Sequence, residues 1–557
     1  MEGQGLDPGA FEGRDFEALI IQGGEATGLK MKPRVVDAQR LKAAIFPILS
    51  FLVGVAFTLF WTNEASKQII SVNTGVSSPA EVDSIQRIHE VRSGIGSGSV
   101  QAAAAWGRPR PVDGPPGLEE RNVSWDGPWV GTESLMAPTK TGLQHVLFGI
   151  GSSSQNYQTR KELIKLWWGP SKTRGYVWLD SPVDGYDWQT EGLPEPQISG
   201  DTSSLPYSGG GPRSCLRIAR IVVEAYRLKL PDVRWFVMGD DDTIFNPEVL
   251  AEVLAGYDHT EMLYLGGNSE THGQMVINGF EMAYGGGGIA ISWPLAHALS
   301  HTMDSCIERY PELWGSDARV HMCTAELGVQ VTRVRGFHQC DLKGNVAGFL
   351  QAHPLAPFVS MHHVLHWDPV FPNMTHMDAL QRLTRGMHAD PVNFLQTAFC
   401  VDQRKLFSVV VSWGYSVKLS IGAWRVGELE RIETTFMSYH WRNWAEQFTF
   451  DTRPEVPVEG GQCGTPVDLW IDDIRPVAGN KIESTYSRKV PVNQTSCSPH
   501  ITRISQVKVV REALPYSTSR DGLSKGPNLR RQCCQSLKFD ASGSTLSINL
   551  GSCNSVF

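Results

Sequence analysis

The sequence predicts an α/β fold followed by a β-rich C-terminal region, and three observations support this prediction. Short apolar runs alternate with amphipathic segments between residues 145 and 256, which is the pattern of strands and helices in an α/β layer sheet. Beyond residue 378 the apolar runs become short, β-branched and aromatic. At 557 residues the chain is also too long for one typical hydrophobic core, so two folded units are expected.

An uncharged apolar stretch, residues 43–62, is long enough for a helix to cross the hydrocarbon core of a bilayer. The mostly polar residues 1–42 precede it, unlike the start of a cleaved signal peptide, so we expect a retained single transmembrane helix. The basic residues before the stretch are Lys30, Lys32, Arg34, Arg40 and Lys42. After it, Glu64 and Lys67 balance each other, so we expect the N-terminal tail in the cytosol and the remaining chain in the lumen.

The composition after this stretch suits a lumenal protein. Residues 63–141 are rich in Gly, Ser, Ala and Pro, which predicts a flexible stem. All 10 cysteines lie later, between Cys215 and Cys553, and their even number is typical of a disulfide-forming compartment. Sequons for N-glycosylation, which would make this a glycoprotein, lie on the same side, at Asn122, Asn373 and Asn493.

Three buried strands are expected from short apolar runs bounded by turn residues, at 145–150, 176–179 and 235–238. A helix over 160–168 has its apolar face at Leu163, Ile164 and Trp167. A second helix ends before Pro231, and its apolar face is formed by Ile218, Ile221, Val222 and Ala225. A third helix is expected to begin at Asn246 as its N-cap.

The C-terminal region has a different pattern. Its β-branched and aromatic runs include residues 407–412 and 415–419, which we interpret as strands. Six of the ten cysteines lie from Cys400 onward, so disulfides are expected there. A net charge of −8 with both signs spread along the chain offers no basic face for a phosphate backbone, and nucleic acid is not an expected partner.

The acidic run Asp240-Asp241-Asp242 follows the predicted strand at 235–238 directly. Ligands of open α/β sheets bind at the carboxyl ends of strands, where these carboxylates would project. The spacing of Asp240 and Asp242 lets one carboxylate reach a metal and the other act through water or a ribose. Carboxylate oxygens suit magnesium or manganese, which commonly share coordination with a substrate diphosphate. The alternative is a solvated acidic turn.

Three segments in this order resemble the Fringe-related glycosyltransferases of family 31, and most closely the uncharacterised plant branch of that family. They are WFVMGDDDTIFNPEVL around Asp240, LGGNSE over 265–270 and AYGGGGIAIS over 283–292. The resemblance runs from about residue 145 to residue 372, and similarity to the plant branch continues beyond it. It implies a GT-A-like, Rossmann-type catalytic domain and a Golgi type II membrane enzyme.

The resemblance further implies transfer of a hexose or N-acetylhexosamine from a UDP-sugar to a glycan or glycoprotein, with a manganese or magnesium cofactor, inversion, and a β1,3-type linkage. Asp242 would be the direct metal ligand, with Asp240 nearer the donor ribose and Asp241 beside the donor. The expected organisation is a cytosolic tail 1–42, an anchor 43–62, a stem 63–141, the GT-A-like domain 142–377 and the β-rich domain 378–557.

The family's Gly-rich stretch beside the donor sugar matches Gly285, Gly286, Gly287 and Gly288. Glycine permits close backbone approach. The alternative is that the four glycines form a mobile turn. The family carries an acidic pair containing the catalytic base where this chain has Ser316 and Asp317. Asp317 is therefore the expected base, and the loss of the first acid keeps a helix-capping role open.

A third metal ligand is expected at Met361-His-His363, where His362 is preferred and His363 stays open. A second hypothesis is an inactive glycan-binding protein that stacks sugars on exposed tryptophans of the β-rich domain. Those residues are Trp413, Trp424, Trp441 and Trp444, and an ordinary place in the core is the alternative for them. A phosphotransferase lacks support because the chain has no GxxxxGK[ST] phosphate loop.

Overall fold

The computed structural model describes residues 140–553 except 186, 210, 353–356, 440–447, 456–464, 490–498 and 514–531. The expected anchor over 43–62, nearly all of the expected stem, two sequons, and Trp441 and Trp444 lie outside the described residues. Among the residues that the structure describes, no helix combines the length and the apolar character needed to cross a membrane. The third sequon residue, Asn373, is exposed.

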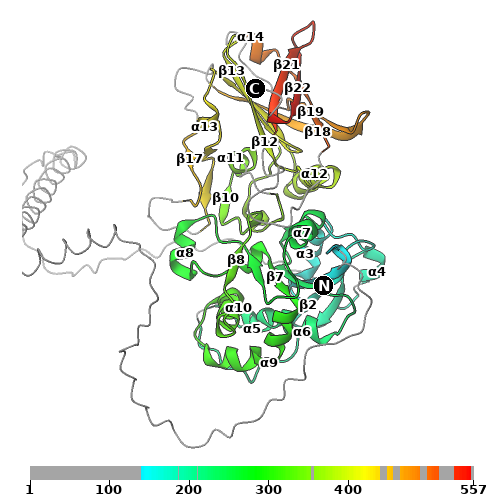
Figure 1. The fold of residues 1–557 in the computed structure, drawn as a ribbon, viewed down its shortest axis with the longest axis vertical. Coiled ribbons are helices and arrows are strands. Elements are labelled where there is room, and N and C mark those ends of the chain that lie inside the picture. The colour runs from blue at the N-terminus through cyan, green and yellow to red at the C-terminus, as the bar shows by residue number, and fades with distance from the viewer. Residues whose placement is uncertain are drawn as a thin grey trace, which may run out of the picture. The chain divides into compact units, whose positions relative to one another are not determined.

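A seven-stranded mixed sheet forms the first part of the described chain, in the order β3-β2-β1-β4-β7-β6-β8 (Figure 1). Its strands are β1 Val146–Gly151, β2 Gly175–Leu179, β3 Glu195–Ile198, β4 Trp235–Asp240, β6 Tyr264–Gly266, β7 Ile289–Ser292 and β8 Val331–Arg333. Strands β3, β2, β1 and β4 run parallel to one another, whereas β7 runs antiparallel to both β4 and β6. The expected α/β layer sheet is present, with this reversed strand inside it.

Helices cover both faces of this sheet. Alternate side chains of one strand point to opposite faces, so each face has its own hydrophobic cluster. In β1, Val146 and Phe148 join one hydrophobic cluster, and Leu147 joins the other. The helices of this part are α3 Tyr157–Ile164, α4 Trp188–Glu191, α5 Ser214–Ala219, α6 Ile221–Arg227, α7 Pro247–Leu254, α8 His272–Asn278, α9 Trp293–Arg309 and α10 Gly315–Glu326. A disulfide, Cys306–Cys323, joins α9 to α10.

The predicted strands and the third helix are confirmed, with small differences at their ends. Helix α3 begins at Tyr157, earlier than expected, and ends at Ile164. The expected second helix is two helices, because the backbone at Arg220 makes i to i+3 hydrogen bonds with Arg217 and Val223. Asn246 takes the N-cap position of α7, but its side chain donates to the Pro391 carbonyl instead of capping the helix.

Further helices and strands lie outside the two large sheets. They are β5 Ile244–Phe245, β9 Phe337–His338, β10 Leu342–Gly344, α11 Ala347–Gln351, β11 Ser360–Met361, α12 His376–Ala389, α13 Val426–Leu429, β15 Ile432–Glu433, β16 Phe436–Ser438, β17 Thr452–Arg453 and α14 Pro499–Thr502, with short 3-10 helices at 143–145, 285–287 and 364–366. Helix α12 spans residue 378, the expected start of the second domain. One continuous hydrophobic cluster contains residues from both sides of that position.

The C-terminal part is β-rich, as the sequence predicts. Its eight-stranded sheet has the order β12-β13-β14-β18-β19-β20-β22-β21. The strands are β12 Thr397–Asp402, β13 Phe407–Ser412, β14 Ser416–Ile421, β18 Val467–Val477, β19 Lys481–Ser487, β20 Gln506–Glu512, β21 Cys533–Phe539 and β22 Thr545–Gly551. Disulfides Cys400–Cys534 and Cys533–Cys553 link this sheet.

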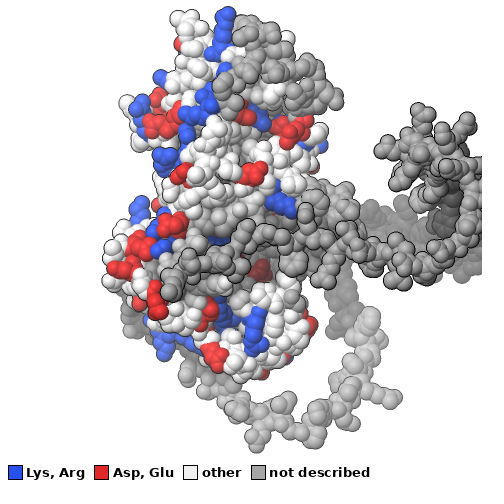
Figure 2. Space-filling view, turned by 180° about the vertical axis from the view of Figure 1, so that it is seen from behind, with Lys and Arg blue, Asp and Glu red and all other residues white. Residues whose placement is uncertain are grey.

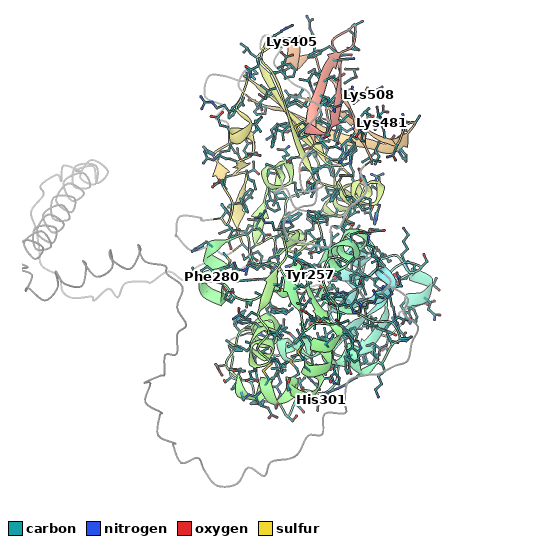
Figure 3. The ribbon with its side chains drawn as sticks, in the orientation of Figure 1. Tyr257, Phe280, His301, Lys405, Lys481 and Lys508 are labelled. Carbon is teal, nitrogen blue, oxygen red and sulfur yellow. A yellow bond between two sulfur atoms is a disulfide. The ribbon has the colours of Figure 1, made fainter. Side chains whose placement is uncertain are left out.

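The surface carries both charges. Figure 2 shows acidic and basic side chains interspersed over the visible described surface. In Figure 3, Lys405, Lys481 and Lys508 mark the part with the eight-stranded sheet, and His301 on α9 marks the part with the seven-stranded sheet.

Candidate functional site

The acidic run sits at the carboxyl end of β4, where the sequence predicts it. Asp240 is the last residue of the strand, and a tight turn follows it. The Asp240 backbone N–H donates to Thr243 Oγ1 at 2.9 Å, and the same hydroxyl donates to the Gly286 carbonyl at 2.8 Å. These bonds fix the turn against the glycine stretch. Asp242 is buried, which differs from the solvated acidic turn of the alternative hypothesis.

His362 reaches this turn through a small sheet. Strand β5 continues the chain directly after the acidic turn, and β11 pairs with it antiparallel, with Met361 opposite Ile244. The next residue after Met361 is His362, so the pairing carries its imidazole to the carboxylates. His362 Nε2 lies 3.0 Å from Asp242 Oδ1 and 3.6 Å from Asp240 Oδ2.

These three side chains have the composition of a divalent metal site. One potential ligand atom from each of Asp240, Asp242 and His362 lies within 4.8 Å of the others. Among the described residues, Nδ1 of His362 is buried and has no hydrogen-bond partner, so none of them holds the ring by a hydrogen bond on that side. Two carboxylate oxygens and an imidazole nitrogen fit manganese or magnesium. Asp240 remains 38% exposed and would face an incoming ligand.

The charges in this cluster are strongly coupled. Burial raises the pKa of Asp240 to about 7, and the neighbouring Asp242 and Asp317 add to that rise. Burial also opposes ionisation of Asp242, but His362 and Arg160 outweigh it and hold the pKa of Asp242 well below its usual range. Burial lowers the pKa of His362, yet Asp242 and Asp240 overcome this effect and raise the pKa to about 9. The carboxylates therefore already stabilise one positive charge, that of the protonated His362 imidazole.

His363 has a left-handed backbone, with φ at 55°, and its ring lies beside that of His362, with 4.0 Å between the ring centroids. Nδ1 of His363 lies 3.1 Å from Asp341 Oδ1, and the ring stacks on Tyr439 with 4.2 Å between centroids. Of the two histidines left open by the sequence, His362 is the one beside the carboxylates.

Two residues that sequence reasoning missed, Ser152 and Arg160, also contact the acidic run. Ser152, directly after β1, donates its hydroxyl to Asp241 Oδ2 at 2.6 Å. Arg160 of α3 donates to the Asp242 carboxylate and lies 3.6 Å from Asp241. Burial raises the pKa of Asp241. Arg160 lies in the expected helix at 160–168, but its helical position alone gave no sign of this contact.

The glycine stretch lies between the acidic cluster and Asp317. A Cβ on Gly286 would stand 2.3 Å from the His362 ring, and one on Gly285 would stand 2.6 Å from Asp317 Oδ1. Ser360 donates its hydroxyl to the Gly287 carbonyl. Gly285 to Gly288 therefore form a hydrogen-bonded turn in close contact with both groups, unlike the mobile turn considered as an alternative.

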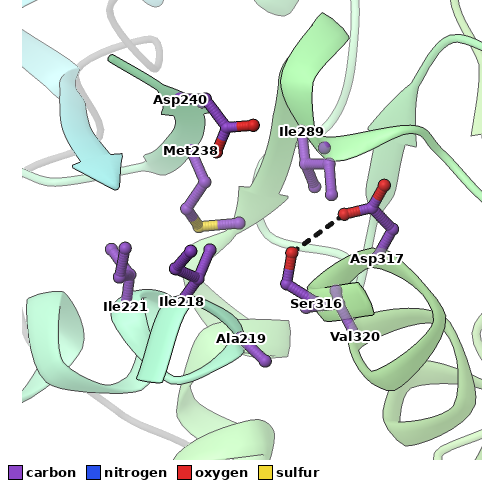
Figure 4. A pocket seen from close by; sticks show the side chains of 11 residues that line it. Ile218, Ala219, Ile221, Met238, Asp240, Ile289, Ser316, Asp317 and Val320 are labelled. Carbon is purple, nitrogen blue, oxygen red and sulfur yellow. Dashed lines mark hydrogen bonds between the residues drawn. The ribbon is translucent and has the colours of Figure 1, made fainter. Parts of the chain in front are cut away.

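Asp317 lies in the first turn of α10 and faces the same hollow as Asp240 (Figure 4). The N-cap position of α10 belongs to Trp314, so Asp317 does not cap the helix. Ser316 donates its hydroxyl to Asp317 Oδ1 at 2.9 Å. Burial raises the pKa of Asp317, while hydrogen bonds from the Gly285 backbone and Ser316 partly offset the rise.

Apart from the two carboxylates, Ser316 and two glycines, the hollow is lined by apolar side chains. Its volume is about 350 Å³ when the open solvent at its mouth is included. Its apolar lining is Ile218, Ala219, Ile221, Met238, Ile289 and Val320. A polar reactant entering here would meet Asp240 on one side and Asp317 on the other.

The tryptophans of the second hypothesis do not form an exposed sugar-stacking face among the described residues. Trp413 is 1% exposed, and its Nε1 donates to Asp390 Oδ2 at 3.0 Å. Trp424 is half-buried, with the Arg453 guanidinium over its ring. Trp413 thus has the core position that was considered as the alternative.

Two family models match the chain. The Fringe-like family matches residues 141–402, and a family of unknown function, DUF604, matches residues 274–534. Their overlap, 274–402, contains the glycine stretch, Asp317 and His362. The mouse beta-1,3-glucosyltransferase is 32% identical over 139 residues, which cover 25% of this chain and 27% of that protein. The chain thus matches about a quarter of the length of this curated relative.

Solved glycosyltransferase structures are also similar to part of the chain. The glycosyltransferase that acts on the major capsid of PBCV-1 is 12% identical, covers 42% of this chain and 98% of its own, and has a TM-score of 0.24. The galactosyltransferase LgtC, in complex with donor and acceptor sugar analogs, is 11% identical, covers 43% of this chain and 95% of its own, and has a TM-score of 0.28.

Proposed function

Because this chain carries a Fringe-like domain over residues 141–402, we propose that it is a metal-dependent glycosyltransferase that uses a UDP-sugar donor. The observation that carries the proposal is the meeting of Asp240, Asp242 and His362 beside the hollow that Asp317 faces. The donor set suits manganese or magnesium, and a carboxylate that could act as the base lines the same hollow as Asp240.

Asp317 is the proposed base for an inverting transfer. The acceptor hydroxyl would give its proton to the Asp317 carboxylate while its oxygen forms a bond to the anomeric carbon. The bond from that carbon to the UDP oxygen breaks on the opposite side, and UDP leaves with the electron pair. A bound divalent cation would supply charge neutralisation for the leaving diphosphate.

The protein's own residues would prepare this step in three ways. Hydrogen bonds from Ser316 and from the Gly285 backbone orient the Asp317 carboxylate. The glycine stretch lets the Asp317 and His362 side chains pack closely against its backbone, because a Cβ on Gly285 or Gly286 would meet those side chains. Arg160 is placed to offer positive charge at the edge of the acidic turn.

We further propose that the transferred group is a hexose or N-acetylhexosamine, passed to a glycan or glycoprotein in a β1,3-type linkage. The proposed location is the Golgi lumen, with residues 43–62 as a type II anchor. The uncharged stretch, its basic flank and the exposed sequon Asn373 support this location.

The test is release of UDP by purified full-length protein in detergent, with a panel of UDP-sugars and of free and protein-linked sugar acceptors. Manganese-dependent release with one donor, lost in chelator and in Asp242→Asn, is the expected result. Glu308→Gln, an exposed carboxylate on α9, is the matched control and should retain release. Folded protein that releases no UDP from any donor and acceptor would contradict the proposal.

A further inference from the structure

The C-terminal β-rich part reaches into the candidate site through β16. This strand pairs antiparallel with β10, with Leu342 opposite Ser438. Immediately beyond the strand, the Tyr439 backbone N–H donates to the Asp341 carbonyl at 2.9 Å. The pairing therefore fixes Tyr439 beside the segment that leads from β9 to β10.

The Tyr439 ring packs on the histidines that follow β11. It lies parallel to the His363 ring, with 4.2 Å between centroids and 5° between planes. It meets the His366 ring edge-on at 4.8 Å, and its hydroxyl lies 3.4 Å from His366 Nε2. The ring is half-buried, so it forms a wall of the site without being part of the core.

His363 needs such support because its backbone is left-handed, with φ at 55°. A residue with a Cβ is less stable in this conformation than in its ordinary ones, because the Cβ approaches the following carbonyl oxygen. Such a conformation persists where surrounding contacts hold it. Here the contacts are the Tyr439 ring on one face of the imidazole and the Asp341 carboxylate beside Nδ1.

Asp341 is itself held in place from both parts of the chain. Its carboxylate accepts a hydrogen bond from the Ser269 hydroxyl, and its backbone carbonyl accepts from Tyr439. Farther along the C-terminal part, the Thr449 backbone N–H donates to the Glu270 carbonyl at 2.9 Å. The C-terminal part thus forms backbone hydrogen bonds with Asp341 and with Glu270, the residue that follows Ser269.

We propose that Tyr439 is a positioning residue of the metal site: by stacking on His363, it holds the left-handed turn that directs the neighbouring His362 toward Asp240 and Asp242. The inference rests on the proposed metal-dependent function. It assigns the C-terminal β-rich part a direct role in that site, because Tyr439 belongs to the region after residue 402, outside the Fringe-like match.

The experiment measures Mn²⁺ affinity directly, by electron paramagnetic resonance of free Mn²⁺ titrated into full-length protein with saturating UDP. Groups that orient metal ligands typically contribute 10- to 100-fold to metal affinity. We therefore expect Tyr439→Ala to weaken Mn²⁺ binding about tenfold, and Tyr439→Phe, which keeps the stacked ring, to stay within about twofold of wild type. Met437→Ala is the matched control, since Met437 is an exposed residue of the same strand.

A separate readout distinguishes positioning from substrate contact. At saturating Mn²⁺, the kcat and the donor KM of Tyr439→Ala should return close to the wild-type values. A defect that persists at saturating Mn²⁺ would overturn the positioning role and indicate contact with a substrate. Wild-type Mn²⁺ affinity in a folded Tyr439→Ala protein would overturn it as well. If the alanine variant does not fold, Tyr439→Leu, which fills the space without an aromatic ring, decides by the same criteria.

The same titrations distinguish failure of the proposed metal site from failure of the proposed role of Tyr439. If wild-type protein binds no Mn²⁺, or if Asp242→Asn binds it unchanged, the metal site itself is wrong and this inference falls with it. If wild type binds Mn²⁺ through Asp242 and Tyr439→Ala makes no difference, the metal site stands and the role of Tyr439 is wrong.

Discussion

Two buried carboxylate–histidine pairs lie close to each other in this protein, with the same spacing and opposite electrostatics. Asp242 and His362 approach within 3.0 Å, and so do Glu270 and His338. The pKa of His362 is raised to about 9 and that of Asp242 is lowered, so this pair is ionised. Burial raises the pKa of Glu270 to about 8 and lowers that of His338 to about 4, so the second pair is neutral at pH 7.

The difference lies in the neighbours. Asp242 also contacts Arg160, and a second carboxylate, Asp240, faces the same imidazole. His338 instead lies against Phe349 and Phe358, and the charge of Asp341 further opposes ionisation of Glu270. A short carboxylate–imidazole distance therefore does not identify a functional site. The ionised pair can exchange its proton for a metal cation, whereas the neutral pair contributes a buried hydrogen bond to the fold.

The largest expected effect follows from removing one charge of the ionised pair. Asp242→Asn should lower metal-dependent UDP release about 1000-fold or more, because stabilisation of the leaving diphosphate contributes several kcal/mol. Steady-state UDP release across manganese concentrations measures this change. Asp258→Asn, in an exposed turn, is the control. A wild-type rate of UDP release in Asp242→Asn would contradict the functional difference between the two pairs.

Asp317→Asn tests the hollow beside the ionised pair. The substitution removes a base but keeps the shape, so kcat should fall about 100- to 1000-fold. Mn²⁺ affinity, measured with UDP present, should remain within about threefold of wild type, since Asp317 is outside the metal cluster. Equal losses of metal affinity and kcat would show instead that Asp317 acts through the metal site.

Matched histidine substitutions compare the two pairs directly. His362→Gln should weaken Mn²⁺ binding about 10- to 100-fold. His338→Gln should leave that affinity unchanged and destabilise the protein by about 1–3 kcal/mol, because it disturbs a buried hydrogen bond. Mn²⁺ titration and chemical denaturation of both variants give the answer. Loss of Mn²⁺ binding in His338→Gln alone would reverse the assignment of the pairs.

The neutral pair also predicts a pH effect on stability. Because the folded-state pKa of Glu270 is raised, its contribution to stability is complete below its ordinary pKa of 4.5 and is lost as pH rises toward about 8. Between pH 6 and pH 8, wild type should lose about 2 kcal/mol more stability than Glu270→Gln, which cannot ionise. Denaturation at several pH values measures this difference. Parallel pH profiles would show that Glu270 is ionised in the folded protein.

Local patterns were sufficient for much of the fold. The apolar runs that became β1, β2 and β4 are short, continuous and bounded by turn residues, so their identity depends little on the remaining chain. The break between α5 and α6 was not predicted, because the apolar face formed by Ile218, Ile221, Val222 and Ala225 keeps its helical spacing across it. The antiparallel direction of β7 likewise depends on its pairing partners.

The candidate site could likewise be predicted from the sequence only in part. The strand before Asp240 predicted where the carboxylates would lie, and family resemblance suggested Asp317. The choice between His362 and His363 depends on a left-handed residue, on the pairing of β11 with β5, and on Tyr439 from the C-terminal part. The partner of Glu270 was also hidden, since His338 is 68 residues away. Contacts over such separations leave no local pattern in the sequence.

A crystal of the full-length protein grown with Mn²⁺ and UDP tests the central claim most directly, through the anomalous signal of manganese. The account predicts one strong peak between Asp242 and His362, at coordination distance from both, with the UDP phosphates completing its coordination. A peak beside Glu270 and His338, or bound UDP with no manganese at Asp242, would contradict it.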